Sequence, residues 1–89
     1  EYGTPQRKME EAKKIIEEVI MKHKNTQDKT IVSFNEFGPH SLNILVIYWI
    51  PNVDLLMSTQ DEINMEIKDR FEKARIEMAF PTQTIHLKR

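Results

Sequence analysis

The chain has 89 residues, of which 13 are basic and 14 acidic, with a formal net charge of −1 and no cysteine. Because domains of roughly 50–250 residues are the rule, we expect a single domain, and the balanced charge argues against nucleic acid or anionic lipid as a partner. The absence of cysteine excludes disulfides and thiolate metal sites, and the longest apolar run, Ile44–Ile50, is far shorter than the ~20 residues of a membrane-spanning helix.

The first predicted element is a helix that begins at Thr4-Pro5 and ends at about His23. The Thr4 hydroxyl suits the N-cap, and proline suits the first helical position. Apolar residues then recur at steps of three and four, which places them on one stripe of the helix: Met9, Ala12, Ile15, Ile16, Val19 and Ile20. This stripe is the face that we expect to pack into the core.

Two strands follow and form a hairpin. Thr30–Phe37 is rich in β-branched and aromatic residues, and Ser41–Ile50 has the strongest strand pattern of the chain. Gly38-Pro39-His40 lies between them and has turn composition. Such a short turn makes the two strands antiparallel partners.

A second helix is predicted over about Asp54 to Ala74. One face carries apolar residues at spacings of four, four and three: Ile63, Ile67, Phe71 and Ala74. Its start is open, because Asp54 is a possible N-cap, while Ser58 with Asp61 three residues later has the pattern of a capping box. A last strand is expected over Thr82–Lys88, so the predicted order is α-β-β-α-β, an α+β domain.

The strand Ser41–Ile50 is apolar on both sides. One face has Leu42, Ile44, Val46, Tyr48 and Ile50, and the other has Asn43, Leu45, Ile47 and Trp49. A two-layer domain with both helices on one side needs only one apolar face. Burying the three large residues of the second face contributes ~5–9 kcal/mol, which is comparable to the whole stability of such a domain.

Two interpretations of this second apolar face remain open. Loops or the chain tail cover it within the domain, or a neighbouring subunit or a preceding domain covers it. We favour the second, because the chain is too short to build a third layer and its start, Glu1-Tyr2-Gly3, resembles a cut in a longer protein.

No pattern of catalysis or ligand chemistry stands out. The three histidines, His23, His40 and His86, have no metal-ligand spacing and are interpreted as surface or partly buried side chains. The serines lack a nucleophile elbow, and two glycines are too few for a phosphate-binding loop. We therefore predict no enzyme, no cofactor and no metal.

Three segments nevertheless resemble one family. Glu36-Phe37-Gly38, followed after two residues by Ser41-Leu42-Asn43, is similar to a hairpin of the small-conductance mechanosensitive channels, the MscS-like family. Ile63-Asn64, Lys68 and Phe71, and then Pro81-Thr82-Gln83, are similar to its C-terminal helix and strand. Thr4-Pro5 also matches the entry to a helix in that family, so the resemblance covers nearly the whole chain.

The resemblance implies a ferredoxin-like two-layer α+β sandwich, residues 1–81, and a C-terminal strand, residues 82–89, that joins the sheet or an oligomeric barrel. It implies a cytosolic cage domain of a heptameric channel in the cell membrane, which supports subunit assembly and a solute-filtering vestibule on the cytoplasmic side. The membrane is reached only through upstream segments. The interface residues implied in this way are Leu45, Ile47, Trp49, Gln83, Ile85 and Leu87.

Two departures from the family pattern carry expectations of their own. Arg75-Ile76 stands where a glycine precedes isoleucine in many members, so we expect the second helix to end differently. The first strand of a ferredoxin-like sheet is largely missing, so we expect an unpaired edge at Ser41–Ile50 through which the isolated chain self-associates.

Two other functions remain to be weighed. The first is a free-standing ferredoxin-like regulatory domain that binds a small ligand at a subunit interface. The second is an enzyme on the same scaffold, such as an acylphosphatase, but the glycine-rich anion loop with its arginine is absent. Several apolar spans of ~20 residues upstream of this chain would favour the channel domain over the regulatory domain.

Overall fold

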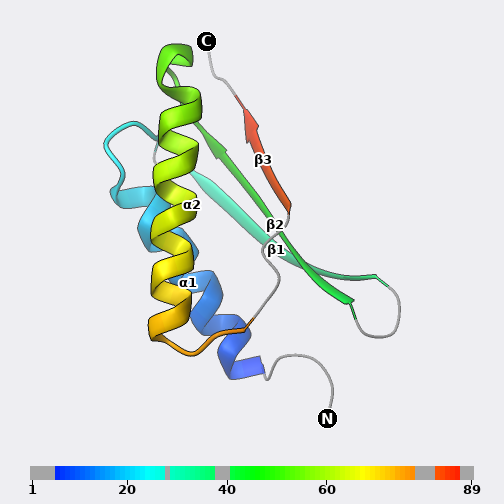
Figure 1. Cartoon of the computed structure of the whole chain (residues 1–89). Coiled ribbons are helices and arrows are strands. Elements are labelled where there is room, and N and C mark those ends of the chain that lie inside the picture. Colours follow the sequence, from blue (N-terminus) through cyan, green and yellow to red (C-terminus); the bar gives the residue numbers. More distant parts are fainter. Residues whose placement is uncertain (1–5, 28, 38–40, 78–81, 87–89) are drawn as a thin grey trace.

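Two α-helices cover one face of a three-stranded sheet in the computed structural model, which describes residues 6–27, 29–37, 41–77 and 82–86 (Figure 1). The two layers confirm the α+β class. The elements are α1 (Gln6–Lys22), β1 (Thr30–Phe37), β2 (Ser41–Trp49), the short 3-10 turn η1 (Val53–Leu55), α2 (Leu56–Lys73) and β3 (Thr82–His86).

The sheet has the order β1-β2-β3, with β2 in the centre. β1 and β2 form the predicted antiparallel hairpin, whose register runs from Phe37 opposite Ser41 to Thr30 opposite Tyr48. The far end of this hairpin projects beyond the two helices (Figure 1). β3 lies on the other side of β2 and runs parallel to it.

The expected unpaired edge of Ser41–Ile50 is therefore wrong for its second half. Leu45–Trp49 pairs with Thr82–His86, from Leu45 beside Thr82 to Trp49 beside His86. The chain leaves β2, crosses over the sheet as α2 and returns beside the same strand, which is the usual connection between parallel strands. The hydrogen-bonding groups on that edge of β2 thus have a partner inside the chain.

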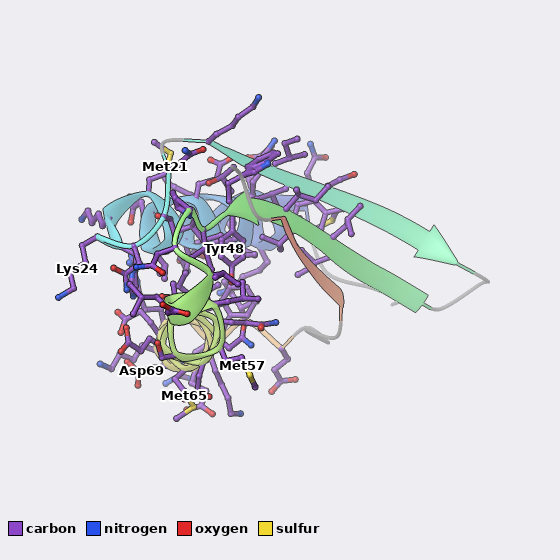
Figure 2. The ribbon with its side chains drawn as sticks, turned by 90° about the horizontal axis from the view of Figure 1, so that it is seen from above. Met21, Lys24, Tyr48, Met57, Met65 and Asp69 are labelled. Carbon is purple, nitrogen blue, oxygen red and sulfur yellow. The ribbon has the colours of Figure 1, made fainter. Side chains whose placement is uncertain are left out.

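The core lies between the helices and the sheet. The predicted α1 stripe is confirmed, since Ala12, Ile15, Ile16, Val19 and Ile20 are buried and Met9 is half-buried. From α2 the core takes Ile63, Ile67 and Phe71, and from β2 it takes Ile44, Val46 and Tyr48. Tyr48 lies between the sheet and the helices in the view from above (Figure 2).

The start of α2 follows neither of the two predicted caps. The Asn52 side chain accepts a hydrogen bond from the Asp54 backbone N–H at 3.0 Å, and η1 leads from there into α2. The Ser58 hydroxyl donates to the Leu55 carbonyl at 3.4 Å, within the helix. Asn52 therefore caps η1, as an asparagine readily does, and α2 itself begins after Leu55 without a side-chain cap. Thr4 and Pro5, the predicted start of the first helix, lie outside the described residues.

The end of α2 corrects another expectation. Arg75 adopts a left-handed conformation with φ of 59°, despite its Cβ. Its N–H donates to the Glu72 carbonyl at 3.1 Å, and the Ile76 N–H donates to the Phe71 carbonyl at 2.8 Å, which is the pattern of a glycine-type helix end. The cost of ~1–2 kcal/mol for a residue other than glycine is offset because Ile76 becomes buried, which contributes ~1.5–3 kcal/mol.

Candidate functional site

The sheet face opposite the helices is the candidate site, and we call it the outer face. Among the described side chains it consists of Ile31, Ser33, Leu45, Ile47 and Trp49. The neighbours that alternate with them on β2, among them Ile44 and Val46, are fully buried beneath the helices. Leu45, Ile47 and Trp49 are only half-buried, because no described helix lies over them.

Cross-strand pairs make this face continuous. Ile31 stands beside Ile47, and Ser33 stands beside Leu45. Ile31 is 45% exposed, so the apolar surface reaches solvent at the β1 side. On the other side, Thr82, Thr84 and His86 are the register partners of the β2 row, at Leu45, Ile47 and Trp49 respectively.

The structure places five of the six interface residues implied by the family resemblance on β2 and β3. Leu45, Ile47 and Trp49 lie together on the outer face. Gln83 and Ile85 belong to β3, where their register partners on β2 are Val46 and Tyr48. Leu87 lies outside the described residues. Of the six residues, Leu45, Ile47 and Trp49 are thus the ones whose side chains the structure describes, and the interface role of all six stays a prediction.

A lysine that the sequence did not single out covers part of the outer face. The Lys29 Nζ lies 5.2 Å from the centre of the Trp49 ring, within the range of a cation–π interaction. The preceding loop is also held to this strand, since the Gln27 N–H donates to the Trp49 carbonyl at 3.0 Å. No local pattern in the sequence indicates the contact of Lys29 with a tryptophan 20 positions away.

A second group of polar side chains lies between the helices. His23 Nε2 is 2.7 Å from Glu62 Oε1, and Arg70 Nη2 is 2.8 Å from Glu18 Oε1. The hydrogen bond from Arg70 lowers the pKa of Glu18 below its ordinary value. These residues border a shallow depression of ≈ 290 Å³, lined by Val19, Lys22, His23, Glu62, Ile63, Glu66 and Arg70.

This depression does not have the chemistry of a metal site. Within the described ranges, no three His, Cys, Asp or Glu side chains form a group that could hold a metal ion. Basic and acidic side chains both line it, and two of them, Glu62 and Arg70, already have partners on the other side of the helix pair. His23 is partly buried, with 15% of its side chain exposed, and its role is to join α1 to α2.

Neither of the described α-helices is apolar enough over a sufficient length to cross a membrane. The chain is matched over residues 1–78 by the family model described as the C-terminal part of the mechanosensitive ion channel MscS. The match includes α1, the β1–β2 hairpin and α2.

Individual relatives are also named as mechanosensitive channels or as members of the MscS family. The chain is 44% identical to the large-conductance mechanosensitive channel MscMJLR and also 44% identical to the small-conductance mechanosensitive channel MscMJ, both of Methanocaldococcus jannaschii. Each match covers 99% of this chain and 26% of the relative. An uncharacterized MscS family protein of Aquifex aeolicus is 28% identical over 99% of the chain and 25% of its own length. The chain thus spans about a quarter of these relatives, and no solved structure matches it.

Proposed function

The chain belongs to the MscS family of mechanosensitive ion channels as a C-terminal domain, and we propose that it is part of a cytosolic cage whose subunits meet through the outer face. Channels of this family are oligomeric, so each domain has neighbours. The full-length protein is a membrane channel, and this domain lies on the cytoplasmic side. Its role is to support assembly and to form the wall of a solute-filtering vestibule, without catalysis.

The outer face is the observation that supports an assembly role. Leu45, Ile47 and Trp49 remain half-buried although they are as apolar as the core residues beside them. Covering three such side chains contributes several kcal/mol, at ~1.5–3 kcal/mol for a large apolar side chain that is fully buried. A neighbouring surface that covers them gains this free energy on assembly.

The proposed assembly is a ring of seven subunits, as the family resemblance implies. In such a ring the same two surfaces meet at every contact, so one weakened contact is repeated around the ring. The participation of strand 82–86 in a barrel between subunits stays a prediction. The alternative of a free-standing regulatory domain is not favoured, because the named relatives are channels.

We test the proposal in the full-length channel with Ile31→Lys. Ile31 is 45% exposed, so a lysine fits the folded domain, but it places a charge on the outer face. We expect the oligomer to dissociate into smaller species in detergent, as measured by size-exclusion chromatography with light scattering.

The matched control is Met65→Lys on α2. Met65 is 63% exposed and points away from the sheet (Figure 2), so the same new charge leaves the oligomer intact. An Ile31→Lys channel whose mass equals that of the wild type would exclude the outer face as the subunit interface. Circular dichroism of both variants checks that the domain stays folded.

A further inference from the structure

The loop between α1 and β1 is held at its start by His23. The Nδ1 atom of this ring accepts a hydrogen bond from the Asn25 backbone N–H at 3.1 Å, and Nε2 lies 2.7 Å from Glu62 Oε1. The Asn25 side chain donates to the Thr59 hydroxyl of α2 at 3.0 Å. One histidine and one asparagine therefore attach the loop to the second helix.

These contacts define the protonation state of the ring. A backbone N–H is always a donor, so Nδ1 must be an acceptor and carries no proton. The proton of the neutral ring is then on Nε2, which donates to Glu62. In the charged ring both nitrogens are donors, so Nδ1 faces another donor and the Asn25 N–H loses its acceptor.

The far end of the same loop is attached to the outer face. The Gln27 N–H donates to the Trp49 carbonyl at 3.0 Å, and the Lys29 ammonium group lies over the Trp49 ring at 5.2 Å. The His23 contact at Asn25 and the Trp49 contact at Gln27 are thus only two positions apart in the chain.

We propose that His23 is a pH-dependent latch, whose protonation releases the loop at Asn25 and uncovers Trp49 on the outer face. Histidine is the side chain whose charge ordinarily changes between pH 5 and 8. The charged groups around His23 are Lys22 on α1 and Glu62, Glu66 and Arg70 on α2. The coupling from His23 to Trp49 stands whether or not the outer face is a subunit interface.

Two effects of protonation oppose each other. The added charge strengthens the attraction to Glu62, but 65% of that side chain is exposed, and ion pairs in contact with water contribute little. The lost hydrogen bond is in a partly buried position, where a donor without an acceptor is costly. The second effect is larger, so the loop opens rather than closes in acid.

The test uses the 89-residue chain and the fluorescence of its single tryptophan. Acrylamide quenching is compared at about pH 8 and about pH 5, the range that spans histidine titration. We expect the quenching constant of the wild type to rise roughly twofold in acid as the loop opens locally. His23→Gln keeps an uncharged side chain at every pH, so its quenching constant stays constant.

The matched control replaces the other two histidines, His40→Gln with His86→Gln, and should retain the full response. An acid response that persists in His23→Gln, or one that is lost in this control, would overturn the latch. So would a wild type with no response.

An independent measurement on the wild type covers the case in which His23→Gln does not fold. The amide resonance of Asn25 and the ring resonances of His23 must shift at the same pH, and the Asn25 amide must exchange faster below that pH. Different midpoints would contradict the proposal.

Discussion

The two faces of β2 are built from similar residues but lie in different surroundings. Ile44 on the inner face is fully buried, whereas Ile47 on the outer face is half-buried. The side chains are chemically identical, and only three positions separate them. The difference lies in what stands opposite: α1 and α2 cover the inner face, and no described helix covers the outer face (Figure 1).

An apolar residue in a strand is thus no proof of a core position. Because Ile47 is hydrophobic, its burial is favourable in free energy, but this does not indicate whether the same chain or another one buries it. In this domain the described helices are both on one side, so neither of them covers the outer face of β2 (Figure 1).

The largest expected effect on the free energy of unfolding comes from replacing Ile44 and Ile47, one at a time, by alanine. Ile44→Ala should lower the free energy of unfolding by about 2–5 kcal/mol, because it removes buried contacts and leaves a cavity. Ile47→Ala should lower it by only about 1 kcal/mol, because less apolar surface is exposed and no enclosed cavity forms. Urea denaturation followed by circular dichroism measures both values. Equal losses would mean that the outer face is packed as tightly as the inner face.

A second prediction concerns Tyr48 on the inner face and its effect on the stability of the domain at alkaline pH. Burial raises the pKa of Tyr48 to about 12, from an ordinary value of 10.0. The folded chain therefore holds this proton more tightly than the unfolded chain does. The associated stability is fully present below pH 10 and is lost as the pH rises to about 12.

Tyr48→Phe removes the titrating hydroxyl and serves as the comparison. We expect the urea midpoint of the wild type to fall more steeply between pH 10 and 12 than that of the variant. Parallel curves would show that Tyr48 does not contribute. Every other residue is the same in both proteins, so its effect is common to the two curves.

The smallest expected effect is at the edge of the outer face. Lys29→Gln removes the cation over Trp49, which is worth about 0.5–1 kcal/mol at an exposed position. We expect acrylamide quenching of Trp49 at neutral pH to increase, while the urea midpoint moves little. Unchanged quenching would mean that the lysine does not shield the ring. Lys24→Gln, at an exposed lysine of the same loop that points away from the domain (Figure 2), is the matched control.

Local patterns predicted the elements of the fold well. The steps of three and four in α1 identified its five buried residues, and the composition of Thr30–Phe37 indicated β1 with its observed bounds. The resemblance carried by Glu36–Asn43 and Ile63–Phe71 indicated the family, which the match over residues 1–78 confirms. These signals are contained in short segments, so no distant contact was needed to interpret them.

Features that depend on distant residues were not predicted. Arg75 takes the left-handed conformation that glycine usually provides at a helix end, and the burial of Ile76 that offsets the cost depends on the packing of the whole core. His23 meets Glu62 across 39 positions of the chain, and nothing in either neighbourhood indicates the pair. The outer face was identified from its apolar row, but the pairing of β2 with β3 joins Leu45 to Thr82 across 37 positions, which no local pattern indicates.

The position of β3 has a consequence for the order in which the domain folds. The first pair of the hairpin, Phe37 and Ser41, is four positions apart, while Leu45 and its partner Thr82 are separated by 82 − 45 = 37 positions. Closing the longer loop costs more entropy, so we expect the hairpin to form early and β3 to add late. Until it does, the free edge and the uncovered apolar row of β2 are exposed together, and the risk of aggregation is concentrated in that interval.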